Sequence, residues 1–279
     1  MIDEVLIQKE DRLKRDLSVY QTLAIAYSGG VDSTYLAAIA HSVLGQEAQM
    51  ILADSPSLPQ TERSSALEIA RSRGWNMTII NTEEFKNDSY LNNDNNRCYL
   101  CKSELFEKMR TYALNHHIRY MAYGAIEDDK MEYRPGQKAA AEYQVVAPLQ
   151  SIGLFKKEIR HLSKALGLPT WNKPSMACLS SRIPTGSRIT EAKLKQVEEV
   201  EEILRSFGFY QYRARHHDNL CRIEIDPLDF HKILDEEIRH KMINQIQSRG
   251  FRFVTLDLLG YRPGSTAPHS IPANVQKIA

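Results

Sequence analysis

Apolar and polar residues follow one another along the first half of the chain in an order that predicts alternating strands and helices. Short apolar runs, long enough for buried strands and too short for helices, lie at 23–26, 50–53, 77–80 and 119–123. Apolar positions at helical spacing indicate amphipathic helices at 2–17, 35–43, 60–73 and 98–115. This alternation is typical of a parallel sheet covered by helices on both faces, so the sequence predicts an α/β fold.

The second half of the chain has a different order of elements. Residues 145–147 favour a further strand, 154–166 favour a helix, and 171–189 have no regular period. The elements expected next are a helix, two strands, a polar helix and a last strand, at 190–207, 209–216, 220–226, 229–249 and 251–258. We therefore predict two domains, an α/β domain over 1–185 and a smaller α+β domain over 186–279.

The first predicted strand ends in a turn rich in serine and glycine, SGGVDS at 28–33, and a helical pattern follows directly. A strand, a glycine turn and a helix N-terminus direct several backbone N–H groups to one point, which attracts phosphate. Glycines permit close approach of the backbone, serines add hydroxyl donors, and an aspartate can cap the helix or help to hold a cation. The candidate phosphate-binding residues are Ser28, Gly29, Gly30, Asp32 and Ser33. An ordinary strand-to-helix turn is the alternative.

Two common phosphate-binding motifs do not describe this turn. It lacks the lysine of a Walker P-loop and the spacing of G-x-G-x-x-G. It resembles instead the SGGxDS pyrophosphate loop of the ATP pyrophosphatase superfamily, whose members cleave ATP between the α and β phosphates. Asp54 and Gly124 also come directly after predicted strands. Because ligands bind at the carboxyl ends of parallel strands, we expect Ser28, Asp54 and Gly124 to converge on one site.

The composition is that of a globular protein of 279 residues, with 42% apolar and 25% charged residues. The formal net charge is only +1, from 36 basic and 35 acidic side chains, which disfavours nucleic acid as a stable partner while leaving room for a local basic patch. The N-terminus is charged without a signal-peptide core, and no apolar run approaches the roughly 18 residues of a membrane span. We therefore expect a cytoplasmic protein that does not enter a membrane.

Three of the four cysteines form a candidate metal site. Cys98 and Cys101 have C-x-x-C spacing at the start of a predicted helix, and Cys178 lies in the irregular segment. Three thiolates can hold an iron–sulfur cluster that leaves one iron open, or can bind zinc together with a fourth ligand. Arg97, Lys102 and the helix N-terminus favour the thiolate forms that ligation requires. The pair alone is a weak signal, since C-x-x-C also occurs as a redox motif or by chance.

Cys221 has a different environment in the sequence. Alternate residues of a strand point to opposite faces, so Cys221 shares a face with Ile223 and Ile225, whereas Arg222 and Glu224 face the other way. We therefore expect a buried structural thiol, with a role as a fourth metal ligand as the alternative.

Five segments together resemble the LarE family. They are SGGVDS at 28–33, EYRPGQKAAAE at 132–142, WNKPSMACLSSRIPTG at 171–186, YRARHHDNLCRIEI at 212–225 and FVTLDLLGYRPGS at 253–265. The members of this family are ATP-dependent sulfurtransferases that help to build the nickel-pincer nucleotide cofactor of lactate racemase. The resemblance implies that the protein uses ATP and Mg²⁺ to adenylylate the carboxylates of pyridinium-3,5-biscarboxylic acid mononucleotide, releases pyrophosphate, and converts the carboxylates to thiocarboxylates. Where relatives often read GYRxGSMN, this chain reads GYRPGSTAP, so no role is carried over to the tail after Ser265.

The resemblance also implies a source of sulfur. One branch of the family has a single cysteine, at the position of Cys178, and gives up its own sulfur to leave dehydroalanine. Another branch adds a C-x-x-C pair and holds a [4Fe–4S] cluster whose open iron carries the transferable sulfide. With Cys98, Cys101 and Cys178 this chain resembles the second branch, and sulfide or a sulfur donor is implied as a partner.

Further site residues follow from the resemblance. Arg213 and Arg215 lie two apart on a predicted strand and share a face, which Glu224 on the next strand can share. In the family, the residues that match Ser181, Arg182, Arg213 and Arg215 bind the substrate phosphate, and carboxylates matching Glu201 and Glu224 bind a divalent cation. The residues expected to flank the nucleotide are Lys102, Asp128 and Arg134. A solvated helix lysine is the alternative for Lys102, and a role in shaping the loop is the alternative for the other two. An exposed strand face with ordinary ion pairs is the alternative for the two strands.

Two other functions compete with this interpretation. A tRNA-thiolating enzyme would keep the reaction and change the substrate, since some of those enzymes also combine SGGxDS with three cysteines. The near-zero net charge and the RPGQKA and CLSSRIP segments count against it. A nucleotide-binding or zinc-binding regulatory module without turnover is the third interpretation. Because family members assemble into higher homo-oligomers, the resemblance also implies a homo-oligomer.

Overall fold

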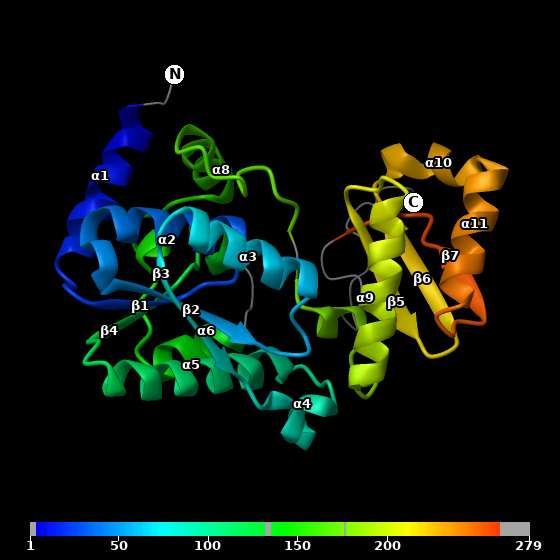
Figure 1. The fold of residues 1–279 in the computed structure, drawn as a ribbon, viewed down its shortest axis with the longest axis horizontal. Coiled ribbons are helices and arrows are strands. Elements are labelled where there is room, and N and C mark those ends of the chain that lie inside the picture. The colour runs from blue at the N-terminus through cyan, green and yellow to red at the C-terminus, as the bar shows by residue number, and fades with distance from the viewer. Residues whose placement is uncertain (1–3, 132–134, 176, 263–279) are drawn as a thin grey trace, which may run out of the picture. The chain divides into compact units, whose positions relative to one another are not determined.

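The computed structural model describes residues 4–131, 135–175 and 177–262, which form two compact units (Figure 1). The first unit comprises Met1–Asn87 and Asn96–Met176, and the second comprises Asp88–Asn95 and Ala177–Ala279. The chain therefore enters the second unit twice. The domain boundary expected at residues 185 and 186 lies inside the second unit, because the irregular segment from Ala177 onwards packs there.

The sheet of the first unit is entirely parallel. Its strands are β1 (Leu23–Ala26), β2 (Ala48–Asp54), β3 (Asn76–Asn81) and β4 (Tyr120–Tyr123), in the order β3-β2-β1-β4. Next to β4, Val146 forms an isolated parallel bridge with Ala122, so the strand expected at 145–147 is reduced to a single bridge. The predicted α/β fold with a parallel sheet is confirmed.

The strands bury side chains in two helical layers, one on each face of the sheet (Figure 1). One layer contains α1 (Glu4–Ser18), α2 (Val31–Leu44), α3 (Gln60–Ser72) and α8 (Lys156–Ala165), and the other contains α5 (Arg97–Asn115) and α6 (Pro135–Glu142). Ile25 and Leu52 pack in the core of the first layer, whereas their neighbours Ala24 and Ile51 pack in the core of the second. This period of two, buried on both sides, explains why the strands are continuous apolar runs in the sequence.

Short elements connect the layers of the first unit. They are η1 (Gly45–Glu47), η2 (Glu84–Lys86), η3 (Glu127–Met131) and α7 (Pro148–Ser151). Glycines and prolines border several of them, as expected where the chain reverses direction. No helix in the described part of the chain is both long and apolar enough to cross a membrane.

The second unit is an α+β arrangement. Its elements are α4 (Asp88–Leu91), η4 (Leu179–Arg182), α9 (Glu191–Ser206), β5 (Tyr212–His217), β6 (Leu220–Ile225), η5 (Pro227–Asp229), α10 (Phe230–Leu234), α11 (Glu236–Gln247) and β7 (Phe253–Leu256). The sheet has the order β5-β6-β7, in which β5 and β6 form an antiparallel hairpin and β7 runs parallel to β6. The order of elements agrees with the sequence, but the single helix expected at 229–249 is wrong, because the extended backbone of Asp235 separates α10 from α11.

Candidate functional site

The SGGVDS turn connects β1 to α2 and is folded by its own serines. The hydroxyl of Ser33 accepts from the backbone N–H of Ser28 at 3.2 Å and lies 3.1 Å from the Ser28 hydroxyl. The N–H of Gly30 donates to the Ser28 hydroxyl at 3.4 Å. Gly30 is the N-cap of α2 and its helix has no side-chain cap. The first turn of α2 therefore presents backbone N–H groups to a ligand, as an anion site requires.

Two glycines allow this turn to pack closely. Gly29 has a φ of +68°, and a Cβ there would lie 2.7 Å from the Cβ of Ala66 on α3. A Cβ on Gly124, directly after β4, would lie 3.0 Å from the backbone nitrogen of Ser33. Gly124 thus lies against the N-terminus of α2. This contact joins Gly124 to the turn that carries Ser28, and the convergence of Ser28, Asp54 and Gly124 on one site stays a prediction.

A lysine from a distant helix contacts the aspartate of the turn. The Nζ atom of Lys156, the first residue of α8, lies 2.9 and 2.7 Å from the two carboxylate oxygens of Asp32. The backbone N–H of Lys156 donates to Asp128 at 2.7 Å. Asp128 was predicted to flank the nucleotide, whereas Lys156 was missed. Lys156 follows Asp32 by 124 residues, and no local pattern in the sequence reports such a pairing.

Oxygen ligands for a divalent cation are present beside the turn. Burial raises the pKa of the Asp32 carboxyl, the ammonium group of Lys156 opposes that shift, and the negative charge of Asp129 adds to it. Mg²⁺ typically takes one or two carboxylates together with phosphate oxygens and water. The donor set at Asp32 therefore fits Mg²⁺. In the ranges that the structure describes, no three or more His, Cys, Asp or Glu side chains are gathered as a complete metal site.

A second lysine, Lys173, also contacts the SGGVDS turn. Lys173 donates to the carbonyl of Gly29 at 3.1 Å and pairs with Glu62 of α3 at 2.7 Å. Arg160 of α8 donates to the carbonyls of Trp171 and Lys173 at 2.9 and 2.7 Å. These hydrogen bonds hold in place the part of the irregular segment that belongs to the first unit. Lys173 belongs to the WNKPS motif, and its contact with the turn was not predicted from the sequence.

The end of β2 carries the next predicted residue, Asp54. Its carboxylate pairs with Arg63 of α3 at 2.9 Å. The hydroxyl of Ser55 donates to the buried Glu84, and Ser57 lies 2.9 Å from Ser55. The carboxyl edge of the sheet is therefore lined by polar groups, as the topology predicted.

Cys98 and Cys101 lie in the first turn of α5. Cys98 is exposed, Cys101 is half-buried, and neither forms a disulfide. Spacing of three residues places them on one side of the helix. The ammonium of Lys102 lies 4.6 Å from the centre of the Tyr123 ring at the end of β4, and a Cβ on Gly136 would lie 2.8 Å from the Lys102 stem. The predicted nucleotide residue Lys102 is thus held between β4 and the start of α6.

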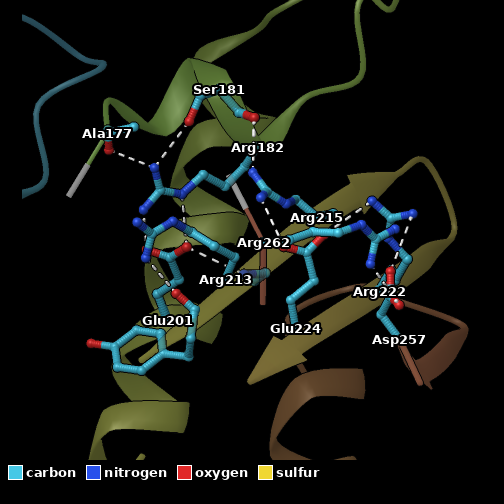
Figure 2. Close-up of polar contacts among 12 residues, drawn as sticks. Ala177, Ser181, Arg182, Glu201, Arg213, Arg215, Arg222, Glu224, Asp257 and Arg262 are labelled. Atoms are coloured by element: carbon cyan, nitrogen blue, oxygen red, sulfur yellow. Dashed lines mark hydrogen bonds and ion pairs between the residues drawn. The ribbon is translucent and has the colours of Figure 1, made fainter. Parts of the chain in front are cut away.

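The second unit contains the third cysteine and a buried arginine (Figure 2). Cys178 is an exposed free thiol directly before η4. Arg182 is fully buried and donates to both oxygens of Glu201, at 2.8 and 3.0 Å. Its other terminal nitrogen donates to the carbonyls of Ala177 and Cys178 and to the Ser181 hydroxyl. Arg182 therefore connects α9 to the backbone that carries Cys178.

The β5–β6 hairpin supplies further buried arginines. Arg213 is directly opposite Glu224, and Arg215 is directly opposite Arg222, so these side chains share one face, as predicted. Arg213, Arg215 and Glu224 are at most 4% exposed. Arg215 bonds to Glu224 at 2.8 Å and to the Ser181 carbonyl at 3.1 Å. The alternative of an exposed face with ordinary ion pairs is therefore wrong.

Positive charge exceeds negative charge in this cluster (Figure 2). The arginines are Arg182, Arg213, Arg215, Arg222 and Arg262, and the carboxylates that pair with them are Glu201, Glu224 and Asp257. Burial, together with the nearby charge of Arg182, lowers the pKa of Arg213 to about 10. The buried Nε of Arg215 has no hydrogen-bond acceptor among the described residues. Forked guanidinium groups match phosphate oxygens, so this cluster of arginines is suited to a phosphate.

The other residues singled out from the sequence lie in different environments. Glu201 and Glu224, predicted as ligands of a divalent cation, are paired with arginines in this structure. Cys221 is fully buried, and burial raises its pKa from the ordinary value of 9.0 to about 12, which confirms the expected inert thiol. Arg134 and the tail after Ser265 lie outside the described residues.

Known proteins resemble this chain over nearly its full length. A family model described as NAD synthase matches residues 8–242. A protein of Synechocystis described as uncharacterised is 41% identical over 260 residues, which cover 93% of this chain and 97% of the relative. The pyridinium-3,5-bisthiocarboxylic acid mononucleotide synthase of Lactiplantibacillus plantarum is 34% identical over 261 residues, 93% of this chain and 94% of that synthase. A protein of Methanocaldococcus jannaschii, also described as uncharacterised, is 30% identical over 261 residues, 92% of this chain and 99% of the relative.

These similarities agree with the fold and with both sites. The matched region of the NAD synthase model includes the SGGVDS turn, and the similarity to the synthase covers both compact units. The chain therefore belongs to the NAD synthase family of pyrophosphate-loop proteins and, within it, to the LarE family that its sequence motifs indicated.

Proposed function

We propose that the protein is an ATP-dependent sulfurtransferase that converts the carboxylates of pyridinium-3,5-biscarboxylic acid mononucleotide to thiocarboxylates, in the biosynthesis of the nickel-pincer nucleotide cofactor. The observation that carries the proposal is the near-full-length similarity to the synthase of L. plantarum, whose name states the bisthiocarboxylic product. A phosphate-binding turn and a buried arginine cluster, one in each unit, supply the two anion sites that ATP and a mononucleotide require. We further propose that the protein is cytoplasmic and forms a homo-oligomer.

The first unit is proposed to activate the substrate. The N–H groups at the start of α2 would bind the β and γ phosphates, with the serine hydroxyls of the turn beside them. Asp32 would hold Mg²⁺, which supplies neutralising charge for the departing pyrophosphate. Residues proposed to line the rest of the nucleotide site are Asp54, Lys102, Gly124, Asp128 and Arg134. A carboxylate accepts sulfur only after its oxygen becomes a good leaving group, and AMP is one.

The second unit is proposed to bind the substrate phosphate. Arg213 and Arg215 project from one face of β5, and the carbonyl of Ser181 accepts a hydrogen bond from Arg215. Arg182 adds positive charge to the same cluster. The carboxylates of Glu201 and Glu224 would partly neutralise the charge of these arginines. We also propose that these two carboxylates bind a divalent cation.

The cysteines are proposed to supply the sulfur. Cys98, Cys101 and Cys178 would ligate a [4Fe–4S] cluster, and cysteines that form no disulfide and are exposed or half-buried suit that role. When bound, the cluster would provide a soft sulfide nucleophile for the activated carboxyl carbon. Cys178 as a sacrificial donor is the competing source.

The phosphate assignment is tested by comparing the mononucleotide with the nucleoside that lacks its phosphate. Wild-type protein should form the thiocarboxylate, seen by mass spectrometry, with a much lower KM for the mononucleotide. Arg215→Met should raise the KM for the mononucleotide more than the KM for the nucleoside, because the nucleoside has no phosphate contact to lose, whereas loss of the ion pair with Glu224 affects both substrates. Lys241→Met, on exposed α11, is the charge-matched control. Absence of a thiocarboxylate product from wild-type protein with ATP, Mg²⁺ and sulfide would refute the proposed function.

The sulfur assignment needs a separate experiment. Protein purified without oxygen should contain iron and acid-labile sulfide, and Cys98→Ser should lose both while keeping ATP pyrophosphatase activity. Cys221→Ser, at a buried thiol outside the proposed ligand set, should keep the iron. Mass spectrometry of Cys178 after turnover then separates the two sources, since an intact residue supports the cluster and dehydroalanine supports sacrifice.

A further inference from the structure

The chain directly after β7 contacts the arginine cluster through an aromatic ring. The guanidinium carbon of Arg213 lies over the ring of Tyr261, 4.8 Å from its centre. We propose that Tyr261 is a positioning residue of the phosphate site, which holds the guanidinium group of Arg213 in the orientation that a phosphate requires. The inference rests on the proposed binding of a mononucleotide by this cluster. It adds a residue for which no role was predicted from the sequence.

The turn that carries Tyr261 is fixed to the end of β6. The carboxylate of Asp257 accepts from the backbone N–H of Leu259 at 2.9 Å. Gly260 has a φ of +68°, a conformation that favours glycine, and an added Cβ would lie 2.7 Å from the carbonyl oxygen of Ile225. The backbone N–H of Tyr261 donates to the same oxygen at 2.8 Å. The backbone of Tyr261 is therefore held beside β6, the strand that pairs with β5.

An aromatic ring holds a guanidinium group differently from a carboxylate. A carboxylate accepts N–H donors and neutralises the positive charge, as Glu201 does for Arg182 at 2.8 and 3.0 Å. A ring attracts the cation through its negative face and takes up none of the N–H groups in the guanidinium plane. Arg213 is 2% exposed, so water competes little with this attraction. Contact with Tyr261 therefore holds Arg213 without neutralising it and without using its donors.

The orientation of Arg213 is also set from its own strand. One terminal nitrogen of its guanidinium group donates to the carbonyl of Tyr212 at 2.6 Å. Arg213 and Arg215 share one face of β5 (Figure 2), and recognition of phosphate by paired N–H donors depends on how each guanidinium plane is oriented. Loss of the ring should therefore weaken phosphate binding through Arg213.

A second contact between an arginine and an aromatic ring provides a matched control. The guanidinium carbon of Arg252 lies over the ring of Phe253, 5.1 Å from its centre, and Phe253 is 51% exposed. Phe253 is paired with Leu220, the first residue of β6, whereas Glu224 lies near the last. Phe253→Leu therefore removes a contact of the same kind outside the arginine cluster.

The test is the binding of inorganic phosphate to the full chain, measured by titration calorimetry. Tyr261→Leu should weaken phosphate binding by about tenfold, because a desolvated contact between cation and ring is lost. Tyr261→Phe keeps the ring and should bind phosphate within about twofold of the wild type. Phe253→Leu should leave the phosphate affinity unchanged.

A double-mutant cycle assigns the effect to the arginine cluster, because inorganic phosphate can also bind at the SGGVDS turn. Arg213→Met should lose the share of phosphate binding that the cluster provides, and Tyr261→Leu added to Arg213→Met should cause no further loss. In turnover, Tyr261→Leu should raise the KM for the mononucleotide more than the KM for the nucleoside that lacks its phosphate, with kcat little changed.

Three results would overturn the inference. Phosphate affinity in Tyr261→Leu equal to that of the wild type would show that the ring does not position Arg213. An equal loss in Tyr261→Phe would assign the effect to the hydroxyl group instead of the ring. A further loss when Tyr261→Leu is added to Arg213→Met would show that Tyr261 acts independently of Arg213.

Two further outcomes are separable from these. If Tyr261→Leu fails to fold, Tyr261→Phe with fluorine atoms on the ring keeps the shape and removes the negative ring face. Phosphate affinity should then fall as fluorine atoms are added, and an unchanged affinity would refute the inference. Wild-type protein that binds phosphate in a manner that depends on Tyr261 but forms no thiocarboxylate would refute the proposed function and leave this inference standing.

Discussion

Gly29 is subject to two separate constraints where the SGGVDS turn packs against α3. Its φ of +68° lies in the left-handed region, which costs other residues free energy, and an added Cβ would lie 2.7 Å from the Cβ of Ala66. Gly74 has a similar φ of +65° with no atom within 4 Å of an added Cβ. Comparing substitutions at the two glycines therefore separates the cost of backbone strain from the cost of steric conflict.

Gly29→Ala should lower the free energy of unfolding by about 2–4 kcal/mol, because strain and overpacking add. Gly74→Ala should cost only the backbone term, about 1–2 kcal/mol. Urea denaturation of both variants measures the difference, and pyrophosphate titration should show weaker binding only for Gly29→Ala. Equal costs would mean that α3 moves away without penalty.

Arg182 was predicted to bind the substrate phosphate, and its contacts indicate an additional structural role. Each nitrogen of its guanidinium donates to the protein, to Glu201 on one side and to the backbone beside Cys178 on the other. The sequence placed Arg182 near a reactive cysteine but could not show that a helix residue 19 positions later would be its partner.

Arg182→Met should therefore destabilise the second unit by about 3–5 kcal/mol, because Glu201 stays buried without its partner. Glu201→Met should cost a similar amount, and the double variant should cost clearly less than the sum of the two. A double-mutant cycle by urea denaturation measures this coupling. Additive costs would show that the two side chains are stabilised independently.

At the scale of elements, the apolar periodicity predicted most strands and helices to within two or three residues, because burial on the sheet sets that pattern directly. The clearest failure is the helix expected at 229–249. A polar segment offers no periodic signal by which a break can be seen, and Asp235 can act either inside a helix or as a cap. In the structure its side chain accepts from the N–H of Ile238 at 3.0 Å and starts α11.

Asp235→Ala should lower the free energy of unfolding by about 1 kcal/mol, because the first turn of α11 loses its capping acceptor. Asp235→Asn keeps a side-chain oxygen and should cost only a few tenths of that amount. Thermal or urea unfolding of the two variants checks the order. A stable Asp235→Ala variant would favour a continuous helix, as the sequence pattern had suggested.

At the scale of the whole molecule, the sequence predicted an α/β part followed by an α+β part, and similarity to known proteins identified the family. It could not predict that residues 88–95 belong to the second unit, since an Asn-rich segment reads as a plain loop. Nor could it pair Lys156 with Asp32 or bury Arg182, Arg213 and Arg215 together. Such contacts join segments that are distant in the sequence and that only the completed fold brings close together.

Asn93 is the residue that fixes the segment 88–95 in the second unit. It is fully buried with a φ of 57°, and its amide donates to the carbonyls of Ile183, Pro184 and Ser187 at 3.2, 2.8 and 3.0 Å. Its own carbonyl accepts from Gly186 at 2.9 Å. The side chain therefore organises the end of the irregular segment that carries Cys178.

Asn93→Gly should lower the free energy of unfolding by about 2–3 kcal/mol, because one buried and two partly buried hydrogen bonds to carbonyls are lost while the backbone conformation stays favourable. Asn93→Ala should cost about 1 kcal/mol more, since alanine resists a positive φ. Hydrogen exchange by mass spectrometry should accelerate at Gly186 in both variants. The amides of β1 in the first unit are the internal control, and equal acceleration there would contradict the assignment of 88–95 to the second unit.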